Sequence, residues 1–246
     1  MSATVRDNTF KTVLNDRQNE EQNMTDIYNY ILSLDSNITC DTTVTAEYSN
    51  PDTTHVPTFN FTFRNNFVLR MTRQNPLSTN FEKKYYFSAI IRGNEVNKML
   101  YPVNDNQYYA RFITAIDTDF FFLWYGSASS QNATPHWSMG YVKDEYGNAH
   151  AGSTSASGTV DITTAIYYDL TDGSTGQFAS LINFGAPAGY IGISDKCPFV
   201  GSGNTYLFSI TDLFSCSAVT LFSTVALNNG HFYFAIGTHT LIEITP

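Results

Sequence analysis

The feature that most constrains the fold is an alternation of apolar and polar side chains with a period of two residues. It is clearest in two neighbouring segments, whose apolar members are Phe59, Phe61, Phe63, Phe67, Leu69 and Met71. Successive side chains of a β-strand point to opposite faces, so this pattern predicts two strands that each have one apolar face. A three-residue loop at residues 64–66 pairs Phe63 with Phe67, Phe61 with Leu69 and Phe59 with Met71, whereas a two-residue loop splits the apolar faces. We therefore predict a hairpin in the first register, with Asn66 in the left-handed conformation.

The same alternation continues along the chain. Further strands are expected at residues 85–92, 108–116, 120–125, 137–142, 160–170, 178–184, 206–211, 220–227, 231–236 and 241–244. The strongest turn signal is Asn229-Gly230, which as a two-residue type I′ turn pairs Leu227 with Phe232 and Val225 with Phe234. Strands at this spacing indicate a mainly β protein, with an antiparallel sandwich or barrel-like body and a short N-terminal α-helical segment.

In residues 1–36 a period of seven replaces the period of two. The two registers are Phe10, Arg17, Met24 and Ile31, and Val13, Glu20, Ile27 and Leu34. A good helix start at Thr25 and Asp26 precedes Ile27. One interpretation is a helical oligomerisation segment that forms a seam with other subunits, so that deleting residues 1–36 leaves a folded β body. Its candidate contact residues are the apolar members Phe10, Val13, Met24, Ile27, Ile31 and Leu34. The other interpretation is one short amphipathic helix that packs on its own domain.

Composition changes suggest how the β body divides. Residues 147–158 are rich in Gly, Ala, Ser and Thr, which is typical of a flexible loop or linker. This stretch either divides a β domain at residues 37–146 from a second β part at residues 159–246, or is a long loop within one β domain. A break at residues 194–204 would set off a small closing β module from residue 205 onward.

Charge is distributed unevenly. The net charge is −9; up to Arg111 there are 11 basic and 12 acidic residues, but from Phe112 onward only 2 basic residues face 10 acidic ones. An acidic C-terminal half repels phosphate groups, so we expect no nucleic acid as a partner.

The cysteine pattern and the start of the chain suggest where the protein is made. Cys40, Cys197 and Cys216 are odd in number and widely spaced, so we expect no zinc site and no essential disulfide. Residues 1–22 are polar and do not resemble a signal peptide, and no segment approaches the roughly 20 apolar residues of a membrane helix. We therefore expect synthesis in a host cytoplasm and no insertion into a membrane.

The sequence contains few signs of catalytic chemistry. It has no G-x-S-x-G nucleophile motif and no H-E-x-x-H metal motif, and its five histidines are scattered. His231 and His239 could meet across a hairpin, although a third ligand is not visible. Asp117 and Asp119 could act as paired carboxylates, but we interpret them as turn formers between two strands. We therefore expect no enzyme activity, no cofactor and no metal.

Pairs of adjacent aromatic residues are the remaining candidates for a binding surface. They are Tyr85-Tyr86, Tyr108-Tyr109, Trp124-Tyr125 and Tyr167-Tyr168. In a strand one member of each pair faces outward, where it could stack on a sugar of a cell-surface glycan or contact another subunit. We interpret these pairs as contacts between subunits.

The order of parts resembles a family of virus proteins. The segment I-T-C-D-T-T-V-T-A-E-Y at residues 38–48 follows a short helix. Near the end come T-Y-L-F-S-I-T-D-L-F-S-C-S-A-V-T-L at residues 205–221 and H-F-Y-F-A-I-G-T-H-T-L-I-E-I at residues 231–244. This order is similar to that of virion proteins encoded in the structural gene clusters of tailed phages and prophages. The resemblance implies a structural component of a virion, in the tail, the baseplate or the head surface, whose partners are further copies of itself and other virion proteins. A receptor-binding module for host glycans and an outer capsid decoration protein are the alternatives.

Overall fold

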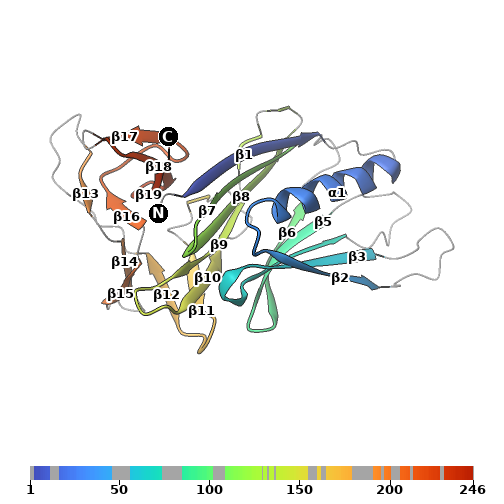
Figure 1. The fold of residues 1–246 in the computed structure, drawn as a ribbon, viewed down its shortest axis with the longest axis horizontal. Coiled ribbons are helices and arrows are strands. Elements are labelled where there is room, and N and C mark those ends of the chain that lie inside the picture. Colours follow the sequence, from blue (N-terminus) through green and yellow to red (C-terminus); the bar gives the residue numbers. More distant parts are fainter. Residues whose placement is uncertain are drawn as a thin grey trace. The chain divides into compact units, whose positions relative to one another are not determined.

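The computed structural model shows a mainly β protein with antiparallel sheets and, in its described part, one α-helix. It describes residues 3–11, 17–45, 56–73, 85–101, 109–128, 130–131, 133–135, 137–154, 160–161, 165–178, 191–194, 197–200, 206–210, 213–227 and 230–245. Figure 1 shows the helix and the strands.

The strands form three sheets. A nine-stranded sheet has the order β1 (Thr4–Lys11), β7 (Tyr109–Ile116), β8 (Phe120–Ala128), β9 (Trp137–Lys143), β10 (Ala149–Ser153), β11 (Ile166–Asp169), β12 (Thr175–Phe178), β14 (Cys197–Val200) and β15 (Tyr206–Ile210). A five-stranded sheet has the order β13 (Ile193–Ser194), β16 (Leu213–Cys216), β19 (Thr240–Ile244), β18 (Phe232–Gly237) and β17 (Thr224–Ala226). The other five-stranded sheet has the order β2 (Thr39–Thr45), β3 (Val56–Thr62), β4 (Val68–Arg73), β5 (Tyr85–Ile91) and β6 (Asn94–Tyr101).

The chain divides into two compact units. Unit 1 comprises residues 1–6, 114–124 and 137–246, and unit 2 comprises residues 7–113 and 125–136. The predicted division was different, since it placed residues 37–146 in one domain and residues 159–246 in another.

In unit 2, helix α1 (Arg17–Leu32) packs on the sheet of strands β2 to β6 (Figure 1). The Tyr28 ring lies 5.3 Å from the ring of Phe59 and 5.7 Å from that of Phe61. The apolar face of the helix is buried inside the chain, because Ile27 and Ile31 have exposed fractions of 0% and 1%. Burial of two such side chains contributes roughly 3–6 kcal/mol to folding.

The heptad interpretation of the N-terminal segment is wrong at its start. Phe10 lies in strand β1, and α1 begins at Arg17 rather than at Thr25. The seven-residue spacing therefore connects a strand with a helix and marks no continuous stripe. The Phe10 ring packs edge-on against Tyr30 at 5.6 Å and Phe112 at 5.7 Å, so it belongs to the aromatic core of unit 2.

The β3–β4 hairpin is confirmed in its predicted register. Phe59 is opposite Met71 and Phe61 is opposite Leu69, and the Phe63 amide donates to the Phe67 carbonyl. A short 3₁₀ turn (Arg64–Asn66) closes the hairpin. Asn66 has φ = 62°, the left-handed value that was predicted for it.

In unit 1, two predictions need correction. Ala149–Ser153, within the predicted linker, forms strand β10, which is buried throughout and pairs with both β9 and β11. In the β17–β18 hairpin, Val225 is opposite Tyr233 rather than Phe234, and the Leu227 amide donates to the His231 carbonyl. The β17–β18 loop is therefore one residue longer than the predicted type I′ turn. This register places Val225 against a buried cluster that contains Tyr233, Ala235, Leu241 and Cys216.

Candidate functional site

The turn between β9 and β10 is organised by one carboxylate. Asp144 Oδ1 accepts hydrogen bonds from the backbone amides of Tyr146 and Asn148, each at 2.8 Å. Asp144 Oδ2 also accepts from the Asn148 side-chain amide at 3.2 Å. Gly147 closes the turn by donating to the Asp144 carbonyl, with φ = 90°, a conformation that favours glycine. Side-chain and backbone contacts together thus fix this turn.

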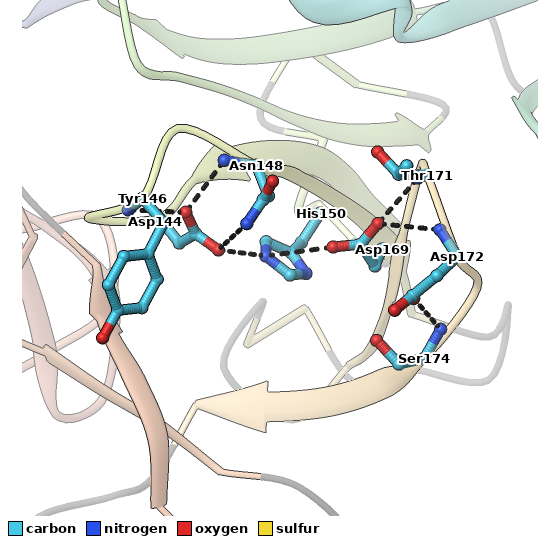
Figure 2. Close-up of polar contacts among 8 residues, drawn as sticks. All are labelled: Asp144, Tyr146, Asn148, His150, Asp169, Thr171, Asp172 and Ser174. Atoms are coloured by element: carbon cyan, nitrogen blue, oxygen red, sulfur yellow. Dashed lines mark hydrogen bonds and ion pairs between the residues drawn. The ribbon is translucent and has the colours of Figure 1, made fainter.

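A buried histidine joins this turn to a neighbouring one (Figure 2). His150 on β10 is opposite Asp169 on β11, and its Nε2 atom lies 2.9 Å from Asp144 Oδ2 and 3.8 Å from Asp169 Oδ2. Both neighbours are carboxylate oxygens, which accept hydrogen bonds when ionised, so we assign the hydrogen to Nε2. Asp169 Oδ1 in turn accepts the backbone amides of Thr171 at 2.6 Å and Asp172 at 3.1 Å. We call Asp144, His150 and Asp169 the turn lock.

The turn lock places ionisable groups inside the protein. Asp144, His150 and Asp169 have exposed fractions of 4%, 3% and 7%. Burial raises the pKa of Asp144, but hydrogen bonds from His150, Asn148 and Tyr146 outweigh it, so the pKa lies below the ordinary value. Asp144 is therefore ionised at neutral pH, with its charge held by N–H donors.

Three large apolar side chains in the described part of the chain are exposed, one on the β9–β10 turn and two on β11. Tyr146 is 73% exposed at the tip of the β9–β10 turn, while Ile166 and Tyr168 on β11 are 53% and 36% exposed. Tyr167 between them is buried and packs edge-on against Phe178 at 5.0 Å. The inward and outward alternation predicted for Tyr167-Tyr168 is confirmed. For Trp124-Tyr125 it is wrong, because both of these side chains are fully buried.

The chemistry of the turn lock is that of an anchor for two turns. Among the described residues, no group of three or more His, Cys, Asp or Glu side chains, the turn lock included, has an arrangement that could hold a metal ion. The residues with hydroxyl groups beside the lock, Thr171 and Ser174, use their backbone amides to bind Asp169 and Asp172. The arrangement therefore fixes the backbone that displays Tyr146.

The predicted oligomerisation residues have different positions. Ile27, Ile31 and Leu34 are buried within unit 2, which favours the second interpretation, a helix that packs on its own domain. Phe10 is half-buried in β1. Met24 lies in α1, but its side chain falls outside the described part, as does the whole of Val13.

The aspartates and histidines that the sequence suggested as catalytic or metal-binding candidates form hydrogen bonds and ion pairs with other groups of the chain. Asp117 accepts the Thr118 amide and Asp119 forms an ion pair with Lys143 at 3.0 Å, so the turn interpretation is confirmed. His231 pairs with Glu243, whereas His239 lies 3.3 Å from the carbonyl of Cys216, so these two histidines have separate partners.

The cysteines are free thiols in the structure. Burial raises the pKa of the Cys197 thiol to about 11, and burial together with nearby Cys197 raises the pKa of the Cys216 thiol to about 12.

Sequence reasoning missed the turn lock because Asp169 comes from a different strand and turn than Asp144 and His150. The available signals were two turn patterns, Asp144 to Asn148 and Asp169 to Gly173, in which an aspartate precedes a glycine. Only the pairing of β10 with β11 brings His150 between the two aspartates.

The helix α1 is too short and too polar to cross a bilayer, and it is the longest helix in the described part of the chain. Comparison of the chain with protein-family models, curated proteins and solved structures found no match.

Proposed function

We propose that the chain is a structural subunit of a tailed-phage particle, in the tail, the baseplate or on the exterior of the head, and that it acts through contacts with other subunits. The observation that carries this proposal is the exposed Tyr146 ring on a turn that is fixed by the turn lock. An exposed aromatic residue on its own is ordinary on a protein surface. An aromatic residue on a rigid turn is a suitable contact residue, because little conformational entropy is lost when it binds.

Two features of the sequence support the location. The order of the sequence segments resembles that of virion proteins from tailed phages, and the C-terminal half is strongly acidic. An acidic surface would be repelled by packaged DNA, which favours a tail or exterior position over the inner face of a capsid. An outer capsid decoration protein fits the same features.

Quantitative mass spectrometry of purified particles tests the proposal. We expect the chain in many copies per particle, in a fixed ratio to known structural proteins. Tyr146→Ala should lower this ratio while leaving the far-ultraviolet circular dichroism spectrum unchanged. Thr171→Ala, on the other turn of the lock, is the control and should incorporate normally. Intact particles that lack the chain would overturn the proposal.

A second candidate function is recognition of host-surface glycans, and one observation favours it. Tyr168 projects from β11 and is opposite Thr175, which is exposed on β12. A tyrosine face beside a hydroxyl group can stack on a pyranose ring and bond to its hydroxyls. Binding to a glycan array that is lost in Tyr168→Ala and kept in Tyr146→Ala would favour this function.

A further inference from the structure

We infer that Tyr146 inserts into an apolar socket with a basic rim on a different protein, an inference that rests on the proposed function and specifies its partner. Hydrogen bonds hold the turn that carries Tyr146. The backbone amide of Tyr146 is bound by Asp144 Oδ1, and the Asp144 carboxylate is bound through Oδ2 to buried His150. The ring is 73% exposed while the backbone beneath it is fixed.

The position of Tyr146 on the turn limits the shape of the partner surface. Tyr146 lies at the tip of a hairpin turn, between Glu145 and Gly147, and all three residues are exposed. A single aromatic side chain on a protruding turn buries most of its surface only when the partner surface is concave. Tyrosine brings a large apolar area and only two side-chain torsions, so a preorganised tyrosine suits a socket of this kind.

The charge of unit 1 limits the charge of the partner surface. The segments of unit 1 contain three basic residues and ten acidic ones, and Glu145 adjoins the tyrosine. A two-fold symmetric contact between two copies through this turn would place two acidic units opposite each other, which is unfavourable. Lysine or arginine residues around the socket would complement the negative charge of unit 1. The favoured partner is therefore a different protein whose socket has a basic rim.

Photo-crosslinking in cells that produce the particle tests the inference. Tyr146 is replaced by p-benzoylphenylalanine, which the exposed position accommodates, and cross-linked peptides are identified by mass spectrometry. We expect one dominant adduct on a different protein, within a segment that carries lysine or arginine. The same replacement at Thr171 is the control and should give an adduct yield at least about tenfold lower.

A charge variant supplies a second readout. Glu145→Lys should lower the yield of the Tyr146 adduct several-fold, and Glu145→Gln should lower it less. An adduct on another copy of this chain, a yield no higher than at Thr171, or an increase with Glu145→Lys would overturn the inference. Because irradiation takes place in the cell, the partner is captured whether or not the chain enters a particle. Failure of the proposed function appears separately, as absence of the chain from purified particles.

Discussion

At the scale of single residues, His150 separates two buried carboxylates. His150→Ala would leave Asp144 and Asp169 facing each other without the N–H donor between them. Leaving a buried acceptor without its donor costs about 1–3 kcal/mol, and more when the acceptor is charged, so we expect a loss of about 3 kcal/mol in the free energy of unfolding, measured in urea at pH 7.

The matched control for this substitution is His231→Ala. His231 also pairs with a carboxylate, that of Glu243, but its side chain is 51% exposed. Exposed ion pairs contribute at most about 1 kcal/mol, so the control should lose far less stability than His150→Ala. Equal losses in the two variants would show that burial of the turn lock has no energetic importance.

The ionisation of Asp144 gives a pH dependence with a defined sign. Its pKa in the folded protein lies below the reference value of 3.8. The contribution of such a group is complete above the unfolded value and is lost as pH falls through the folded value. We therefore expect the difference in unfolding free energy between the wild type and Asp144→Asn to be largest above pH 4 and to shrink below it.

Asp35 provides a parallel case in unit 2. Burial raises its pKa, but contacts with Asn37 and Arg64 outweigh it and lower the pKa below 3.8. The difference in unfolding free energy between the wild type and Asp35→Asn, measured by urea titrations between pH 7 and pH 2, should therefore also shrink as the pH falls. For Asp144→Asn, a difference in unfolding free energy that stays constant from pH 7 to pH 2 would contradict the assignment of a negative charge to the Asp144 carboxylate.

At the scale of elements, local pattern predicts some strands and fails for others. The β3–β4 hairpin was predictable because all six alternating apolar residues fit only one loop length. Strand β10 was missed because Ala149, Ala151 and Gly152 lack the bulky side chains that mark a strand. The pairing of β10 with β9 and β11 determines its conformation, and this information lies outside the local sequence.

The loop between β17 and β18 shows a different limit. The Asn-Gly dipeptide predicted a turn correctly, and Gly230 has φ = 82°. The register depends instead on which face of β18 meets the core. Tyr233 and Ala235 face the cluster that Val225 packs against, while Phe234 packs near Trp124 at 6.5 Å. Both faces are apolar, so alternation alone could not select between the registers.

Glycine in β10 has a packing role that can be tested. A Cβ atom on Gly152 would lie 2.5 Å from the Ile166 carbonyl oxygen and 3.0 Å from the Tyr167 ring. Tyr167 is fully buried, so it cannot move aside cheaply. We expect Gly152→Ala to destabilise the protein by about 3 kcal/mol, the upper part of the range for overpacking, measured by urea unfolding.

Gly93 is the control for this substitution. It has φ = 77° and nothing within 4 Å of the added Cβ, so Gly93→Ala introduces backbone strain without a collision. That strain costs about 1–2 kcal/mol. A loss in Gly152→Ala no greater than in Gly93→Ala would mean that β10 adapts to the added methyl group.

At the scale of the whole molecule, the sequence predicted the fold class but not the division into units. The chain of unit 1 includes residues 1–6 and 114–124 in addition to its C-terminal part. Neither segment carries a composition signal that distinguishes it from its neighbours. Their membership follows from long-range contacts, for example the hydrogen bond from the Ala3 amide to the Glu243 carbonyl at 2.8 Å.

The position of α1 in unit 2 determines what removing the N-terminal segment should do. Deleting residues 1–36 removes buried Ile27, Ile31 and Leu34, and it removes the Tyr28 ring that covers Phe59 and Phe61. A separate oligomerisation segment could be deleted without loss of fold. We expect instead that the truncated chain loses its cooperative thermal transition, monitored by near-ultraviolet circular dichroism.

A single substitution separates the loss of the helix packing from the other effects of truncation. Ile31 is 1% exposed, and Ile31→Ala should cost about 2–5 kcal/mol because it leaves a cavity under the helix. Asn29, two residues earlier, is exposed, so Asn29→Ala should change stability by less than about 0.5 kcal/mol. If Ile31→Ala melts like the wild type but changes the size of the protein in sedimentation experiments, the helix faces another chain. A lowered melting temperature at unchanged size would place it in the core of its own unit, as the burial of Ile27 and Ile31 indicates.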